Sequence, residues 1–266
     1  MSFDVMVFDP AGAPDEPSRI GTWLRELDDA STARGAEAST ALSVWERDMR
    51  TLFRGYEEAP ETLPDDGRFA GYTRQGSSIR LACTYSVAAD LEAALLATAP
   101  QHRVGFWIMS AGPQRIWVPP ARPLDTSPVA GFTLTLEGRG DIDDPSEAQV
   151  AAAAGWLDIE YGPGFLILER ADGDYVQAAG GSAGLTVEWR TDAASPSFRH
   201  RVAATSADES GEMIPLQGHG RTHPVLPNER LFARDAGLIF RDFLRGDDPT
   251  PRYAWHDITQ QLGAKG

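Results

Sequence analysis

The sequence has few of the residues that disulfide and lysine chemistry require. It contains one cysteine, Cys83, and one lysine, Lys265, among 266 residues. A single cysteine excludes a disulfide within the chain and is typical of a protein in a reducing cytoplasm. Because Cys83 lies in an alternating apolar run, we predict a buried structural thiol. We therefore expect a cytoplasmic protein whose fold does not depend on covalent cross-links.

Long apolar runs are absent as well. No run approaches the roughly 20 residues that span a membrane. The opening MSFDVMVFDP lacks the basic and apolar segments of a signal peptide. Hydrophobic residues make up 42% and charged residues 24% of the sequence, as in an ordinary soluble globular protein. The formal net charge of −15 repels nucleic acid and attracts cationic proteins. We expect no membrane and no nucleic-acid partner.

Three short motifs resemble functional sites, but each lacks a necessary part. His219 and His223 have the spacing of two zinc ligands on a helix, but neighbouring glycines and Pro224 oppose a helix there. Residues 141–144 begin like a calcium loop and lack its central glycine and final glutamate. The glycines of residues 180–184 lead into a predicted strand, without the lysine of a phosphate loop. We predict a polar loop around His219, and neither a metal nor a cofactor.

The apolar pattern of the first half predicts a mixture of helices and strands. Apolar residues recur every three to four positions in helices and every second position in strands. The expected order is strand 3–8, a helix around 20–27, a helix around 42–56, a loop at 60–71, strand 79–85, helix 87–99, strand 104–109, a turn at 110–113 and strand 115–118. This order predicts an α+β layer, a small sheet with helices packed on one face.

Residues 119–128, PPARPLDTSP, are the best linker in the sequence. They carry four prolines in ten residues and have little apolar surface to bury. We predict an N-terminal α+β module at residues 1–118 and a C-terminal α+β domain at residues 129–266. The expected fold class is α+β, with two small mixed or antiparallel sheets whose helices pack on one face.

The second half also alternates between strands and helices. A strand is expected at residues 132–137, followed by a helix with Asp144 as N-cap, Pro145 in its first position and Glu147 in its third. Residues 156–190 are expected to form three strands, and residues 198–202 a further one. Apolar residues between 232 and 243 predict an amphipathic helix. Trp189 and Trp255 are expected in the core.

Acidic residues accumulate on the predicted strands of the second half. Residues 137–190 contain eleven aspartates and glutamates and only three arginines. No nucleophile motif accompanies them, so we predict a surface that binds a basic partner protein. Tyrosines at turn edges are expected to anchor that contact, because aromatic residues dominate binding hot spots. The predicted partner-binding residues are Asp158, Glu160, Tyr161, Glu169, Asp172, Asp174, Tyr175 and Glu188.

Other readings of the same residues remain open. Two of Glu160, Glu169 and Glu188, if within about 5–6 Å of each other, could serve as acid and base in a hydrolase or transferase for a small molecule. These carboxylates could also be a solvated polar face without a role. A third possibility is a scaffold or regulatory module whose partner binds the first domain.

Several segments of the second half match a known pattern. They are residues 145–147 (PSE), 165–170 (FLILER), 173–177 (GDYVQ), 185–190 (LTVEWR) and 225–227 (VLP), then an amphipathic helix, Gly246, Pro251 and Trp255. In these residues the second half resembles the Imm1-type immunity proteins of bacterial polymorphic toxin systems. The first half is similar to a bacterial module that begins MSFD-x-x-VFDP.

The resemblance implies a function that composition does not provide. Members of such a family are cytoplasmic, non-catalytic α+β proteins that bind a cognate toxin domain one to one and block its active site. Many of these toxins act on nucleotides and have basic clefts, which an acidic inhibitor surface would occupy. The expected partner is therefore a cognate toxin protein with a basic active-site cleft.

Overall fold

The computed structural model describes residues 2–14, 16–29, 39–62, 67–111, 115–160, 162–218, 221–247 and 252–263. The chain divides into two compact units, Met1–Leu124 and Asp125–Gly266. The division lies inside the proline-rich segment 119–128. Asp125 itself takes part in the second unit, because its carbonyl accepts a hydrogen bond from the backbone N–H of Ala148.

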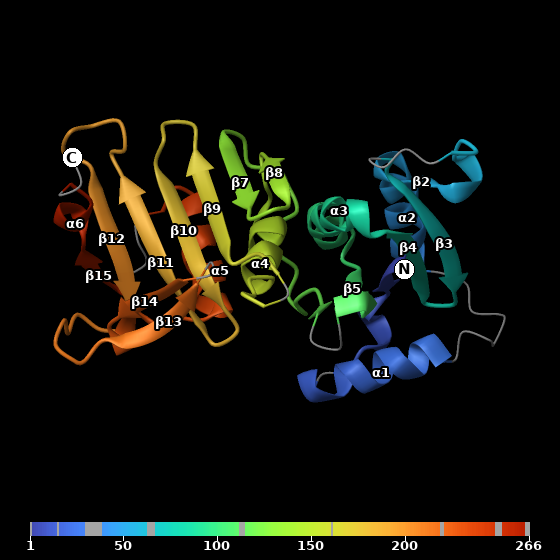
Figure 1. Cartoon of the computed structure of the whole chain (residues 1–266), viewed down its shortest axis with the longest axis horizontal. Coiled ribbons are helices and arrows are strands. Elements are labelled where there is room, and N and C mark those ends of the chain that lie inside the picture. The colour runs from blue at the N-terminus through green and yellow to red at the C-terminus, as the bar shows by residue number, and fades with distance from the viewer. Residues whose placement is uncertain are drawn as a thin grey trace. The chain divides into compact units, whose positions relative to one another are not determined.

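The first unit is built on a six-stranded mixed sheet (Figure 1). Its strand order is β2-β3-β4-β1-β5-β6, and all neighbours are antiparallel except β2 and β3. The strands are β1 (Ser2–Phe8), β2 (Arg54–Gly55), β3 (Phe69–Gln75), β4 (Ser78–Thr84), β5 (Gly105–Ile108) and β6 (Ile116–Trp117). The strand predicted at residues 3–8 is thus confirmed, and it pairs with β4 on one side and β5 on the other.

Helices cover both faces of this first sheet. They are α1 (Pro17–Asp29), α2 (Thr40–Leu52) and α3 (Ala88–His102). Met6 and Phe8 of β1 form a buried cluster with Leu24 of α1. On the other face, Tyr72, which shares that face with Val5 through the strand register, donates to a carbonyl at the end of α2. The predicted α+β class is confirmed, although the helices of this unit lie on two faces rather than one.

The second unit is built on a seven-stranded antiparallel sheet in the order β15-β12-β11-β10-β9-β7-β8. Strands β9 to β12 form a meander, and β15 returns from the end of the chain to pair with β12 (Figure 1). The strands are β7 (Phe132–Leu136), β8 (Gly140–Asp143), β9 (Phe165–Arg170), β10 (Tyr175–Gly181), β11 (Gly184–Thr191), β12 (Arg199–Ala204) and β15 (Ala254–Asp257).

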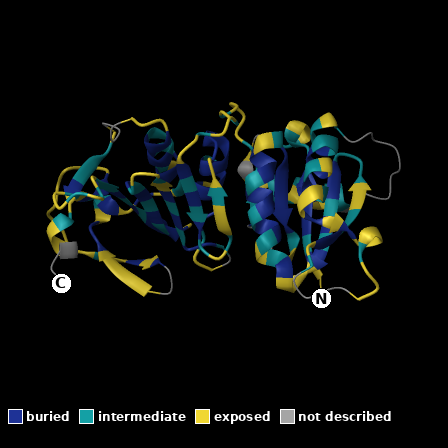
Figure 2. Ribbon diagram, turned by 90° about the horizontal axis from the view of Figure 1, so that it is seen from above, coloured by how far each residue is buried: buried dark blue, intermediate teal, exposed yellow. Residues whose placement is uncertain are grey.

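Two helices cover one face of this second sheet. They are α4 (Glu147–Gly155) and α5 (Ala233–Leu244), and a short α6 (Thr259–Gly263) follows β15. The ring of Phe243 on α5 packs edge-on against Trp189, with 5.3 Å between the ring centroids. Arg245 donates through two nitrogens to Glu147, which joins the end of α5 to the start of α4. Within each unit the buried residues gather between helices and strands (Figure 2).

A separate hairpin, β13 (Ile214–Gly218) and β14 (Arg221–Val225), follows the meander. Pro215 and Pro224 lie directly opposite each other in it. Proline has no N–H, so two opposed prolines fit only at a pair whose backbone groups point away from the partner strand. Each outer edge of the hairpin therefore lacks one hydrogen-bond donor.

The start of α4 differs from the prediction. Ser146, rather than Asp144, is the N-cap: its hydroxyl accepts from the N–H of Gln149, and the Gln149 side chain accepts from the N–H of Ser146. This reciprocal pair satisfies two free N–H groups of the first turn, which a lone aspartate cannot do. Asp144 instead adopts a left-handed backbone with φ of 49°, and its carboxylate accepts from Gly131.

Polar strands were also missed. Strand β3 begins within the loop predicted at residues 60–71, β8 contains Asp141 and Asp143 of the calcium-like motif, and β13–β14 lies where a polar loop was expected. These strands lack a regular apolar alternation because β8 lies at a sheet edge, β13 and β14 form a separate hairpin, and β3 pairs with β2 over only two residues. The turn predicted at 110–113 lies partly outside the described residues.

The structure also bears on the thiol of Cys83 and on membrane-spanning helices. Cys83 is buried in β4, as predicted, and burial together with the charge of Asp4 raises the pKa of its thiol to about 12. Such a thiol is protonated at neutral pH and poorly nucleophilic. Among the described residues, no helix has both the length and the apolar character that a membrane span requires.

Gly180, near the end of β10, gives a test of this packing. Its φ is 133°, and a Cβ atom there would collide with the carbonyl oxygen of Gly184. We expect Gly180→Ala to lower the free energy of unfolding by about 3 kcal/mol, because the backbone must move. Gly138→Ala is the control: its φ is also positive, but its Cβ would meet nothing within 4 Å, so about 1 kcal/mol is expected. Equal losses in urea unfolding would contradict the close approach.

Candidate functional site

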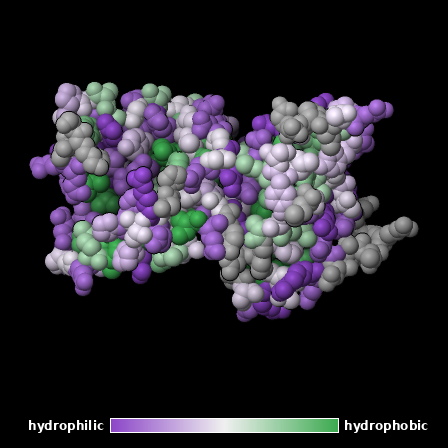
Figure 3. All heavy atoms as spheres, in the orientation of Figure 1, coloured by the Kyte–Doolittle hydropathy of each residue, from purple (hydrophilic) through white to green (hydrophobic). Residues whose placement is uncertain are grey.

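One face of the second sheet carries no helix among the described residues, although the β13–β14 hairpin contacts β10 and β11. Strand register places a common set of side chains on this face, which we call the open face: Glu169, Tyr175, Gln177, Glu188, Arg190 and His200. In Figure 1 the open face is turned toward the viewer, with α5 behind the strands. Figure 3, in the same orientation, shows hydrophilic side chains over much of this unit with smaller apolar areas between them.

Glu188 on β11 is the centre of a hydrogen-bonded cluster on the open face. Its Oε2 atom accepts from the side-chain amide of Gln177 at 2.7 Å and lies 2.7 Å from Nε2 of His200. Nε2 must donate in this contact, because an ionised carboxylate oxygen only accepts. The His200 residue is 2% exposed, whereas the Glu188 side chain is 28% exposed. The cluster thus joins a buried imidazole to a carboxylate that solvent reaches.

The surroundings of Glu188 favour its ionised form. Burial raises the pKa of this carboxyl, but the hydrogen bond and charge of His200 and the amide of Gln177 outweigh it. The charge of His223, on β14, acts in the same direction. The pKa of Glu188 is therefore lower than its ordinary value, and Glu188 carries a fixed negative charge at neutral pH.

Tyr175 and Arg190 border the cluster. The Tyr175 ring packs edge-on against the imidazole of His200, with 5.9 Å between centroids. The guanidinium of Arg190 lies 4.4 Å from the ring centroid of Phe198 and 5.9 Å from that of Tyr175. Within the described part of the chain, no ion pair joins Arg190 to Glu188. The cation of this face is therefore directed to aromatic rings rather than to the carboxylate.

Exposed carboxylates line the side of the open face formed by β8, β7 and β9. Glu169 on β9 lies opposite Thr133, which lies opposite Asp143, while Thr135 lies opposite Asp141. The Thr135 hydroxyl donates to Asp141 at 2.7 Å. Asp141, Asp143 and Glu169 are all exposed, and we call these three residues the acidic rim.

Two of the predicted partner-binding residues are bound by an arginine of the same hairpin. Arg170 donates to Asp172 at 2.8 Å and to Asp174 at 2.9 Å. The hydrogen bond from Arg170 holds the pKa of Asp172 below its ordinary value. Asp174 is buried and also accepts from the backbone N–H of Ala193 at 3.0 Å. These two charges are largely used within the unit, and Asp174 has little surface to offer a partner.

Two further predicted residues lie at the other end of β9. Asp158 accepts from the N–H of Glu160 at 2.8 Å, which shapes the loop before the strand. Four residue steps separate Phe165, where β9 begins, from Glu169, a distance of about 13 Å at roughly 3.3 Å per step. Tyr161 lies outside the described residues. The predicted set therefore divides into three places, of which the open face holds Glu169, Tyr175 and Glu188.

The same register separates the carboxylates of the hydrolase alternative. Glu169 on β9 and Glu188 on β11 have β10 between them and are offset by two residues. Strand spacings then put their Cα atoms about 12 Å apart. Glu160 precedes β9, at its far end. The three carboxylates do not converge as an acid and base pair would require.

His200 is a member of the cluster that the sequence did not single out. It lies in the strand expected at residues 198–202, and β12 (Arg199–Ala204) confirms that strand. Its partner Glu188 is twelve residues away, and their contact depends on how β11 pairs with β12. Alternation within one strand gives the face of a residue but not its neighbour on the next strand.

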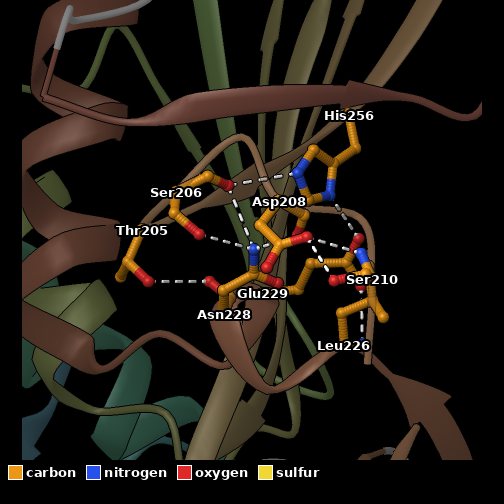
Figure 4. Close-up of polar contacts among 8 residues, drawn as sticks. All are labelled: Thr205, Ser206, Asp208, Ser210, Leu226, Asn228, Glu229 and His256. Carbon is orange, nitrogen blue, oxygen red and sulfur yellow. Dashed lines mark hydrogen bonds and ion pairs between the residues drawn. The ribbon is translucent and has the colours of Figure 1, made fainter. Parts of the chain in front are cut away.

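A second polar cluster anchors the loop after β12 (Figure 4). The side-chain amide of Asn228, in the short 3-10 helix η6 (Pro227–Glu229), donates to the Ser206 carbonyl at 3.0 Å, the Ser206 hydroxyl at 2.9 Å and the Asp208 carbonyl at 2.7 Å. Buried His256 lies between Glu229, 2.8 Å from Nδ1, and the Ser206 carbonyl, 3.2 Å from Nε2. These polar groups are engaged with one another, so the cluster holds the loop in place.

Comparisons add no relative from which a site could be transferred. A search of protein-family models, of curated proteins and of solved structures finds no match to this chain. Among the described residues, no group of three or more histidine, cysteine, aspartate or glutamate side chains could hold a metal ion. His219 lies outside the described residues. The function is therefore inferred from the geometry of the open face.

The lowered pKa of Glu188 predicts a loss of stability in acid. A group whose pKa is lower in the folded state stabilises that state above its unfolded pKa of about 4.3, and this contribution is lost as pH falls through the folded pKa. We expect Glu188→Gln to lower the free energy of unfolding by about 1–2 kcal/mol at pH 7, and less near pH 3.5. The control Glu209→Gln changes an exposed residue. A loss that urea unfolding finds constant across this pH range would refute the assignment.

Asn228 allows the second cluster to be tested separately. Asn228→Ala is expected to cost about 1–3 kcal/mol and to speed amide exchange over residues 205–210, because three acceptors lose their donor. Asn228→Asp should cost more, since it turns a carboxylate oxygen toward the same acceptors. Gln217→Ala, which removes a bond only to Thr222 on the exposed hairpin, is the control. If the aspartate variant is as stable as the alanine variant, the donor role of Asn228 is wrong.

Proposed function

We propose that this chain is a non-catalytic immunity protein that binds and neutralises a basic toxin domain through the open face and the acidic rim. The observation that carries the proposal is a helix-free sheet face with exposed carboxylates along one side and the ionised Glu188 in its interior. Side chains on neighbouring strands are held at fixed spacings, which suits recognition of a protein surface.

Charge supports a basic partner. The formal net charge is −15, and such a charge speeds the approach of a cationic protein at low salt. Arg170 compensates the carboxylates of the β9–β10 turn, whereas the residues directly opposite the acidic rim on the described strands are Thr133, Thr135 and Tyr175, none of them basic. The rim is therefore the part of this unit that is best suited to guide a basic surface onto the open face.

The resemblance to Imm1-type immunity proteins supports the same role. Its matching segments FLILER and LTVEWR lie in β9 and β11, the strands that contribute Glu169 and Glu188 to the open face. The role also fits a cytoplasmic location, which we infer because a toxin that enters a cell must be met there. The separation of Glu160, Glu169 and Glu188 gives the hydrolase alternative no supporting pair.

Charge reversal at the acidic rim tests the proposal. The partner is first captured from the native extract with the tagged chain, identified, and expressed alone and together with the chain. A toxic protein that becomes harmless on co-expression meets the first requirement. We then expect Asp141→Lys, Asp143→Lys and Glu169→Lys in one variant to lower the association rate constant about tenfold or more at low salt, and less at high salt.

The matched control changes the same charge elsewhere in the unit. Glu209→Lys, Glu212→Lys and Asp247→Lys replace three exposed carboxylates that lie outside the open face. This variant should bind at a rate within about twofold of the original chain. Equal slowing in both variants would mean that only net charge matters. A partner without toxicity would overturn the immunity role itself.

A further inference from the structure

Buried carboxylates in this protein are matched with arginine. Removing a carboxylate from water is costly, and a guanidinium restores hydrogen bonds as well as charge. Four of the five buried acidic residues among those described have such a partner. The pairs are Glu46 with Arg50 and Arg74, Glu92 with Arg115, Glu147 with Arg241 and Arg245, and Asp174 with Arg170.

Glu229 and the half-buried Glu188 contact a histidine instead. Of the two, only in Glu229 does each carboxylate oxygen have a hydrogen-bond partner among the described residues. One oxygen of Glu229 contacts His256 and the other accepts from the N–H of Leu226. Glu188 receives both of its donors, from Gln177 and His200, on Oε2. Its Oε1 atom has no hydrogen-bond partner among the described residues, and the side chain is 28% exposed. Glu188 thus presents a fixed carboxylate oxygen with free lone pairs on the open face.

The first unit shows how this chain holds a guanidinium. Arg50 donates to Glu46 at 3.0 Å and to Glu57 at 2.7 Å, and its guanidinium carbon lies 4.2 Å from the ring centroid of Tyr72. A tyrosine ring and a carboxylate together thus enclose the cation. Planar stacking combined with directed hydrogen bonds is a property of arginine that lysine does not share.

The open face has the same two components, but among the described residues no arginine donates to the carboxylate. Tyr175 and Glu188 are diagonal neighbours on β10 and β11, close enough for an aromatic and a long side chain to act together. His200 links them, since it contacts the Tyr175 ring and the Glu188 carboxylate. The guanidinium of Arg190, on the same face, lies closer to the ring centroid of Phe198, at 4.4 Å, than to that of Tyr175, at 5.9 Å.

We propose that Glu188 and Tyr175 form a receptor for one arginine side chain of the protein partner. The guanidinium stacks on the Tyr175 ring and donates to Oε1 of Glu188, while Gln177 and His200 position the carboxylate through Oε2. This inference rests on the proposed function, since the arginine belongs to a partner on the open face. It names the chemistry that the interior of that face recognises, as distinct from the long-range attraction of the acidic rim.

A small probe tests the receptor without the partner. The full chain is titrated with N-acetyl-arginine amide, and the Gln177 side-chain amide and the rings of Tyr175 and His200 are followed by NMR. We expect saturable shifts with this probe, about fivefold weaker binding of N-acetyl-lysine amide, and no shift with the neutral citrulline analogue. Equal shifts with citrulline, or no shifts with the arginine probe, would overturn the proposal.

Variants of the chain then locate the probe. Glu188→Gln should abolish the shifts, Tyr175→Leu should weaken binding about three- to tenfold, and the control Asp247→Asn, at an exposed residue outside the open face, should leave it within about twofold. Tyr175→Leu keeps the Glu188 cluster, so it tests the receptor even if Glu188→Gln unfolds the chain. Arginine shifts that persist unchanged in both variants would place the probe elsewhere and refute the assignment.

The partner separates this inference from the proposed function. A toxin that binds the original chain and Glu188→Gln with equal affinity would overturn the arginine receptor and leave the immunity role intact. Saturable probe binding at Glu188 in a chain that neutralises no toxin would keep the receptor chemistry and overturn the immunity role. Loss of toxin binding of about tenfold or more in Glu188→Gln, with the acidic rim unchanged, is the expected result.

Discussion

The antiparallel register of β9 to β12 is the constraint on which the second unit depends. It assigns Leu168, Val176 and Val187 to the helices on one side, and Glu169, Glu188 and His200 to the other. A slip of one residue in any of these pairings would exchange the two sets and bury charge against α5. The packing of the apolar side chains against the helices therefore also fixes the position of the polar cluster on the opposite face of the sheet.

Arginine supplies nearly all of the positive charge in this protein. The sequence has 24 basic residues of the two kinds and a single lysine among them. A guanidinium forms several directed bonds at once, so Arg245 can join α5 to Glu147, and Arg170 can hold two aspartates of one turn. Several acidic residues are therefore already bound by arginine within their own unit, and the net charge of the chain overstates how many are left to bind a partner.

Sequence reasoning recovered the parts of the fold that depend on local pattern. Strands such as β1 and β11 and helices such as α3 follow from apolar periodicity, and the α+β class follows from their order. It failed where a contact with another residue or strand of the chain decides the local structure. Ser146 and Gln149 cap α4 through a reciprocal bond that outcompetes Asp144, and β8 is a strand because β7 pairs with it. Neither can be inferred from apolar periodicity.

The candidate site shows the same division. Glu169, Tyr175 and Glu188 were predicted because acid and aromatic residues on strands are visible in the sequence. The binding of Asp172 and Asp174 by Arg170 could have been noticed, since these residues lie within four positions of one another. The contact of Glu188 with His200 could not, because it depends on the pairing of two strands across a seven-residue connection, residues 192–198.

The opposed prolines of the β13–β14 hairpin affect whether another chain can add a strand to it at high protein concentration. Pro224 lies among exposed residues of β14, a strand whose outer side would otherwise accept another chain. An incoming strand would meet carbonyls there but find a donor missing at the proline. Fibril growth from this hairpin is therefore discouraged even at high concentration.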